Sequence, residues 1–83
     1  MKLEHLEKFA NIMGTNVHPR LGAELALLAR RGHLNWLKAN SGERALSEEG
    51  KYHKNRVASI TTKIVREVDR DTLSPSIMWR LSI

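Results

Sequence analysis

The side chains best suited to chemistry in this sequence are cations and amides that could contact a polyanion. A first set surrounds the start of a leucine-rich segment, where a helix N-terminus would also favour a phosphate. Within this set, Arg20 could bond a guanine edge through two hydrogen bonds, and Asn16 could bond an adenine edge. The candidates for DNA binding are Thr15, Asn16, His18 and Arg20 in this set, and Lys38, Asn40, Ser41, Arg44, Lys51 and Lys54 further along the chain.

Each of these side chains also has a simpler explanation. Asn16 could cap a helix by accepting a hydrogen bond from a backbone N–H, instead of reading a base. Arg20 could be a solvated charge, and Lys51 and Lys54, with Arg56 that could extend the same basic face, could belong to a solvated helix face. Trp36 is expected in the core or at an interface, because no other aromatic residues are interleaved with it to stack on bases.

Other kinds of chemistry find little support. The chain has no cysteine, which excludes a disulfide framework, a thiolate zinc site and a cysteine nucleophile. Its histidines are scattered, without a carboxylate or second histidine at the spacing of a zinc motif. They are His5, His18, His33 and His53. No phosphate-binding loop, dinucleotide-binding glycine motif or nucleophile elbow is found. We therefore expect no enzyme activity, no cofactor and no metal.

Composition and charge favour a single small domain with an anionic partner. Eighty-three residues make one domain, over 1–83, and bury only a limited core. The formal net charge is +5 and the pI is near 10.1, which suits double-stranded DNA. No apolar run approaches the roughly 20 residues that a membrane span needs. A cytoplasmic location without membrane contact is expected.

Apolar spacing and capping residues divide the chain into five segments. The pattern predicts helices over 2–13, 16–31, 48–69 and 75–82, and a strand pair over 33–47.

The segment 33–47 has two interpretations. Leu34 and Trp36 alternate with polar residues, as in a half-buried strand, and Asn40 and Gly42 provide a turn. A hairpin is favoured, because a continuous helix would carry a Ser-Gly pair in its interior. The expected fold class is therefore α+β and mainly helical, with an all-α small helical bundle as the alternative.

Several of these features occur in an order known from one family. Ala10 on the first helix precedes a turn glycine, Gly14; a leucine-rich phrase ends the next helix; and Leu-Ser-Glu-Glu-Gly over 46–50 opens the long helix. In this order, the features resemble the winged helix-turn-helix of MarR-like and PadR-like bacterial and phage transcriptional regulators, over about residues 3–55. The resemblance implies a recognition helix over 16–31, a wing over 33–47 and a long C-terminal helix.

The predicted function is that of a sequence-specific DNA-binding transcriptional regulator of prokaryotic or phage type, acting as a homodimer. Two-fold symmetry is the usual solution, because half-sites repeat about every 34 Å along one face of the duplex. The expected dimer or partner contacts are apolar residues of the last two helices: Ile60, Ile64, Ile77, Met78, Trp79 and Leu81.

A function of a different class is the alternative. Here 33–47 is helical, the charge is incidental, and the C-terminal tail docks on another protein, with no direct DNA readout. Residues 55–65 and 75–81 are similar to the C-terminal part of Hha-type modulators. Phage-encoded inhibitors of host proteins fit the same class.

Overall fold

The computed structural model describes residues 2–82, and that range is helical without any strand. The predicted helices over 2–13, 48–69 and 75–82 are confirmed, with bounds that differ by no more than two residues at either end. The elements are α1 (Leu3–Thr15), α2 (Pro19–Ala39), the 3-10 helix η1 (Gly42–Leu46), α3 (Glu48–Asp69) and α4 (Ser76–Leu81).

The α+β fold and the wing are wrong. Residues 33–39, predicted as the first strand of a hairpin, form the C-terminal part of α2, and residues 42–46 form η1. The predicted hairpin turn, at residues 40–42, instead follows the end of α2. The Asn40 side-chain amide donates to the Trp36 carbonyl at 2.9 Å, and Gly42 adopts a positive φ of 84°. The chain is not a winged helix-turn-helix. The all-α alternative is confirmed.

Packing explains why α2 continues past Gly32. A Cβ at this position would lie 2.2 Å from Cδ2 of Leu3, so the glycine admits α1 and does not end a helix. The next residue, His33, is 0% exposed and faces inward. The alternation of Leu34 and Trp36 is too short to distinguish a strand from a helix. Tertiary contacts at Gly32 and His33 favour the helix.

The turn between α1 and α2 also differs from the prediction. The second helix begins at Pro19, not at residue 16, and Asn16 is the C-terminal cap of α1. The N-cap of α2 is His18, whose Nδ1 accepts a hydrogen bond from the Leu21 N–H at 3.3 Å. Pro19 occupies the first turn, where its missing N–H costs little.

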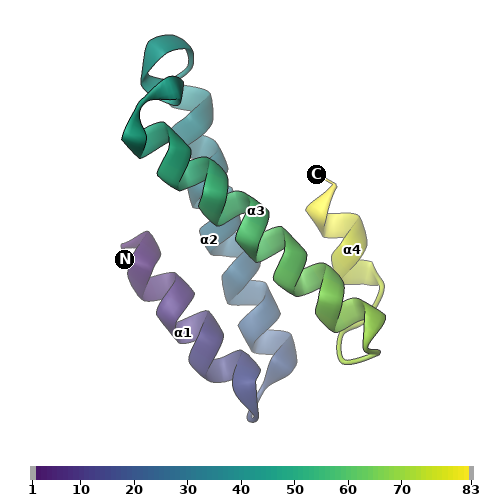
Figure 1. Ribbon diagram of the computed structural model, residues 1–83. Coiled ribbons are helices and arrows are strands. Elements are labelled where there is room, and N and C mark those ends of the chain that lie inside the picture. Colours follow the sequence, from purple (N-terminus) through teal and green to yellow (C-terminus); the bar gives the residue numbers. More distant parts are fainter. Residues whose placement is uncertain (1, 83) are drawn as a thin grey trace.

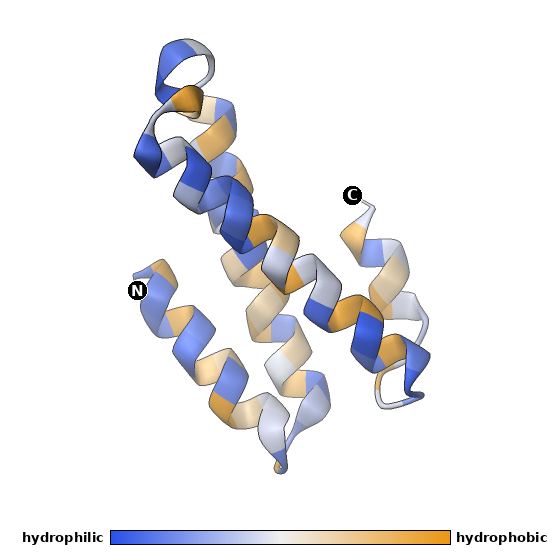
Figure 2. Ribbon diagram, in the orientation of Figure 1, coloured by the Kyte–Doolittle hydropathy of each residue, from blue (hydrophilic) through white to orange (hydrophobic). Residues whose placement is uncertain are grey.

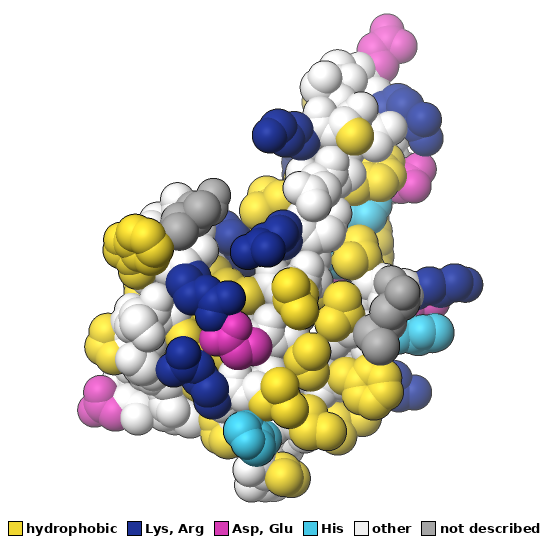
Figure 3. All heavy atoms as spheres, turned by 180° about the vertical axis from the view of Figure 1, so that it is seen from behind, with side chains coloured by type: hydrophobic (Ala, Val, Ile, Leu, Met, Phe, Trp, Pro, Cys, Tyr) yellow, Lys and Arg dark blue, Asp and Glu magenta, His cyan; other side chains and the backbone are white. Residues whose placement is uncertain are grey.

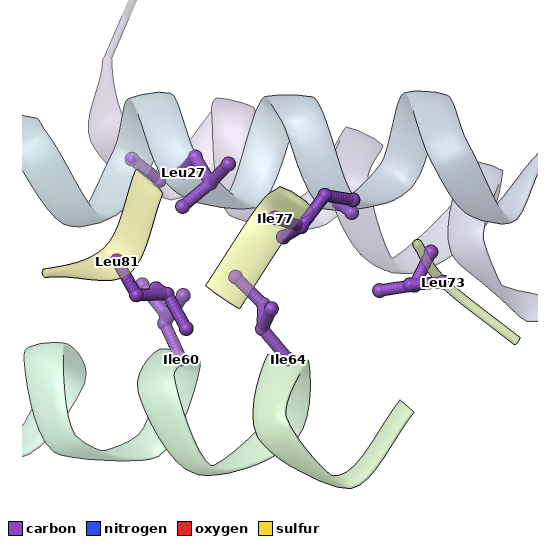
Figure 4. Close-up of a cluster of buried hydrophobic side chains, with 8 residues drawn as sticks. Leu27, Ile60, Ile64, Leu73, Ile77 and Leu81 are labelled. Carbon is purple, nitrogen blue, oxygen red and sulfur yellow. The ribbon is translucent and has the colours of Figure 1, made fainter. Parts of the chain in front are cut away.

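The hydrophobic core lies between α2, α3 and α4 (Figure 4). Four of the residues predicted for a dimer or partner interface are buried in it, because α4 folds back and the chain covers its own apolar stripe. These are Ile60, Ile64, Ile77 and Leu81. The other two, Met78 and Trp79, are exposed, and Trp79 is 69% exposed.

The packed helices form an elongated molecule in which α1 and α3 lie on one side of α2. In Figure 1, α1 and α3 both lie in front of α2, and α4 packs beside the C-terminal half of α3. Figure 2 shows hydrophobic and hydrophilic residues interleaved along each helix, as amphipathic packing requires. The Cα extents are 39 × 23 × 15 Å. Because α1 and α3 share one side of α2, a groove is left between them.

Candidate functional site: a basic groove beside a buried histidine pair

The residues predicted to bind DNA do not form one surface. Thr15, Asn16, His18 and Arg20 lie at the turn between α1 and α2, at one end of the molecule. The remaining candidates are at the opposite end, around η1 and the start of α3 (Figure 1). These are Lys38, Asn40, Ser41, Arg44, Lys51 and Lys54. The 21 residues of α2 separate the two sets by roughly 30 Å at 1.5 Å per residue.

Three of these cations are also paired within the chain. The Arg20 guanidinium lies 3.4 Å from a Glu24 carboxylate oxygen, and the Lys51 ammonium lies 3.5 Å from that of Glu48. Arg44 is 3.7 Å from a Glu49 oxygen. These exposed pairs are weak, but they reduce the positive potential at both ends.

A groove of about 540 Å³ runs between α1 and α3, with α2 as its floor. Its floor is lined by small side chains, and α2 and α1 cross closely there. A Cβ on Gly22 would lie 2.5 Å from the Gly14 Cα and 2.9 Å from the Ala10 carbonyl oxygen. Apolar and small lining residues are Ala10, Gly14, Pro19, Gly22, Ala23, Ala26, Ile60, Ile64 and Leu73.

Three cations edge the groove along α3. Arg56, Lys63 and Arg70 follow one another at intervals of seven residues, so they form a row that repeats about every 10.5 Å. Lys63 donates to the Asn11 side-chain oxygen across the groove, and Arg70 lies 3.4 Å from a Glu67 oxygen. Lys63 and Arg70 are both exposed and accessible to a ligand.

A buried polar network begins where the groove meets Glu7. One oxygen of Glu7, Oε1, accepts hydrogen bonds from Arg56 Nε at 2.9 Å and from His33 Nε2 at 2.8 Å. The three residues come from α1, α3 and α2, so the network joins all three long helices. Charge-assisted hydrogen bonds of this kind are stronger than neutral ones.

The network continues into a pair of histidines. The Nδ1 atoms of His33 and His53 are 2.7 Å apart. Because the Glu7 carboxylate only accepts hydrogen bonds, Nε2 of His33 carries a proton, and one further proton must lie between the two Nδ1 atoms. Two protonated rings would point N–H groups at one another. The Trp36 ring stacks on His53 with centroids 4.3 Å apart, and the Tyr52 ring meets His53 edge-on at 5.2 Å.

The electrostatic environment fixes the charges of this network. Burial raises the pKa of Glu7, but the hydrogen bonds from Arg56 and His33 outweigh burial, and the net pKa is lowered. The pKa of Arg56 is raised, chiefly by its hydrogen bond to Glu7. Burial, and secondarily the neighbouring His33, lowers the pKa of His53. Glu7 and Arg56 are therefore an ion pair at neutral pH, with an uncharged His53 nearby.

This network is structural in character. Among the residues that the structure describes, no buried polar side-chain atom lacks a hydrogen-bond partner, and neither histidine lines the groove. Within residues 2–82, no three histidine, aspartate or glutamate side chains are placed to hold a metal ion.

Sequence reasoning treated the four histidines as scattered and so missed the pair. His33 and His53 are far apart in sequence, and only the antiparallel packing of α2 and α3 brings them together. A signal was present for Glu7, which interrupts the apolar side of α1 between Leu3 and Ala10. A charge at an inward-facing position of a helix implies a buried partner.

No helix in the described part of the chain combines the length and apolar character that crossing a bilayer would require. Comparison of the chain with models of protein families, with curated proteins and with solved structures finds no match. The function proposed below is therefore argued from the geometry of the chain itself.

Proposed function

We propose that this chain is a small helical protein-binding modulator, whose groove between α1 and α3 accepts an acidic amphipathic helix of a partner protein. The observation that carries the proposal is the row of Arg56, Lys63 and Arg70 along a groove with a floor of small residues. The absence of cysteine suits a cytoplasmic location, which belongs to the same proposal.

The shape of the groove favours a helix as the occupant. Two helices that lie on one side of a third leave the position of a fourth helix unfilled, and a partner helix would complete a four-helix arrangement. Ala26 and Ser59, which line the groove and are not buried, have small side chains that let the backbone of such a helix come close. From Arg56 to Arg70 the row extends about 21 Å, the length of a 14-residue helical segment.

The charges favour an acidic partner. A helix lying parallel to α3 presents its own residues i, i+7 and i+14 at the same 10.5 Å repeat. Glutamates at these positions would face the three cations. Arg56 is paired with Glu7 and Arg70 with Glu67, whereas Lys63 is exposed and donates to the Asn11 amide, so Lys63 is the groove cation most available to an acidic ligand.

Sequence-specific DNA recognition is a weaker explanation of this structure. It depended on a wing that the fold replaces with a helix, and on residues that lie at opposite ends of α2. The chain's net charge of +5 still supports weak electrostatic binding to any polyanion.

A peptide panel tests the proposal. Three helical peptides share one apolar face and carry Glu, Gln or Lys at i, i+7 and i+14, and each is titrated into ¹⁵N-labelled protein. We expect the Glu peptide to shift the amides of groove residues, and the Lys peptide to leave them unchanged. Equal binding of the Glu and Lys peptides, or the absence of groove shifts at saturating Glu peptide, would contradict the proposal.

Charge reversal sharpens this test. Lys63→Glu should weaken Glu-peptide affinity by about fivefold, the equivalent of roughly 1 kcal/mol for one exposed ion pair. Lys38→Glu makes the same change in net charge at the far end of α2 and serves as the control. Equal losses in both variants would show that only net charge matters, which contradicts a role for the groove.

A further inference from the structure

A second surface of α1 and α2 is apolar and is left partly exposed by the residues that the structure describes. Figure 3 shows hydrophobic side chains gathered over the side of the molecule that is hidden in Figure 1. Leu28 is 48% exposed and Ile12 is 52% exposed. By helical spacing, Phe9, Ile12 and Met13 share one side of α1, and Leu21, Leu25 and Leu28 share one side of α2. All six are exposed or half-buried, and we call them the α1–α2 face.

Helical geometry separates the α1–α2 face from the groove. At 100° per residue, Phe9 lies about 160° around α1 from Asn11, which lines the groove. On α2, Leu21 and Leu28 are seven residues apart and share one side, whereas Ala26 points into the groove. A partner on the α1–α2 face therefore leaves the groove open.

The accessible surface of the chain is larger than that of a typical monomer. It measures 5754 Å². A monomeric protein of 9.5 kDa is expected to expose about 5,050 Å². This excess of about 700 Å² is counted over the whole elongated chain, and it is of the same order as the roughly 800 Å² that each partner buries in a standard interface. The radius of gyration, 13.0 Å, also exceeds the roughly 11.8 Å expected for this length.

We infer that a second copy of this chain covers the α1–α2 face in a two-fold symmetric dimer. The face is an antiparallel helix pair, and two such pairs pack as a four-helix arrangement in which each copy offers the same residues. None of its six residues is charged. Two copies of the face can therefore meet without bringing like charges together. This interface differs from the predicted one, whose Ile60 and Ile64 are buried within the chain. The inference is independent of the proposed function.

Sedimentation equilibrium on the full chain tests the dimer. We expect a mass of twice 9.5 kDa, about 19 kDa, at micromolar concentrations, and a monomer on dilution. Leu28→Glu should raise the dimer dissociation constant by more than about tenfold, because it places a charge within the apolar face. Leu46→Glu is the matched control, since Leu46 is 71% exposed in η1 and lies outside the face. This control should sediment like the wild type.

A measurement without any variant keeps the inference testable if Leu28→Glu fails to fold. Diluting ¹⁵N-labelled wild-type protein should shift the amides of Phe9, Ile12, Leu21 and Leu28, and leave those of α4 in place. A monomeric mass at high concentration would overturn the inference. So would a folded Leu28→Glu variant that dimerises like the wild type, or dilution shifts confined to residues outside the α1–α2 face.

Discussion

Removal of the Glu7 carboxylate should destabilise the fold far more than the loss of a surface charge. Glu7 lies on α1, the helix that adds least to the core, and its Oε1 atom holds both Arg56 of α3 and His33 of α2. In the Glu7→Ala variant, Arg56 can turn towards solvent, because about a third of its side chain is already exposed. His33 has no such freedom, since its side chain is 0% exposed.

The magnitude follows from this asymmetry. An unsatisfied buried donor costs about 1–3 kcal/mol, and a hydrogen bond to a charged group contributes about 1.5–3 kcal/mol. Water can hydrogen-bond to the freed Arg56 side chain, so the loss of the Arg56–Glu7 bond contributes less than this to the destabilisation. We therefore expect Glu7→Ala to lower the free energy of unfolding by about 2–4 kcal/mol, a large part of the 5–15 kcal/mol typical of a domain. Glu7→Gln keeps an oxygen acceptor and should cost about half as much.

Urea unfolding at neutral pH, followed by circular dichroism, measures this change. Glu4→Ala is the control on the same helix, because Glu4 is exposed in the first turn of α1 and its loss removes only a helix-dipole interaction of about 0.5 kcal/mol. An effect of Glu7→Ala no larger than that of Glu4→Ala would refute the argument that the network joins the three long helices.

Three further predictions concern the same structure. Stability should fall as the pH drops below about 6.5, because the pKa of His53 is lowered in the folded chain, so the unfolded chain binds a proton that the folded chain does not. The free energy of unfolding should then fall by at most about 1.4 kcal/mol per pH unit for this one proton. A second loss should follow below about pH 4.5, where the lowered pKa of Glu7 makes protonation favour the unfolded chain; thermal melts that show no change between about pH 8 and 3 would contradict both statements. Gly22→Ala should destabilise the fold by about 1–3 kcal/mol in urea melts, since its Cβ would press on the Gly14 backbone, and a neutral effect would show that α1 moves aside freely. Random duplex DNA should bind weakly at about 50 mM salt and hardly at all at about 200 mM, as measured by fluorescence anisotropy; tight binding that persists at the higher salt would restore a DNA-binding function.

Periodic apolar residues were enough to predict most of the helices. The stripe in 48–69 and the Ser47 cap define α3, and the Ser47 hydroxyl does accept a hydrogen bond from the Gly50 N–H. The amphipathic pattern over 2–13 likewise defines α1. In these segments, local capping and hydrophobic period agree with the tertiary structure.

The prediction of a hairpin over 33–47 failed because glycine has two uses that a sequence does not distinguish. It can end a helix or form a turn, and it can make room inside a helix for a packed neighbour. Gly32 looks like a helix stop, but it provides room for Leu3. Gly14 looks like a turn residue, but it lies within α1 and faces Gly22. Both roles depend on contacts between α1 and α2, and these cannot be read from either helix alone.

The groove between α1 and α3 could not be predicted from the sequence for a related reason. Arg56, Lys63 and Arg70 are spaced by seven residues on one helix, which is visible in the sequence. That they border a groove follows only from α1 and α3 sharing one side of α2. The residues predicted to bind DNA were expected to act together, but the structure places them in two sets at opposite ends of α2.

The two surfaces proposed here make a joint prediction about stoichiometry. The groove and the α1–α2 face use different sides of α2, so a dimer through Leu21 and Leu28 keeps both grooves open. Calorimetric titration with the Glu peptide should therefore give one peptide per chain and two per dimer. The Leu28→Glu monomer should bind the peptide with unchanged affinity. One peptide per dimer would mean that the dimer covers a groove, and loss of peptide binding in a folded monomer would mean that the groove is completed by the second copy. Either result would contradict the separation of the two sites that α2 imposes.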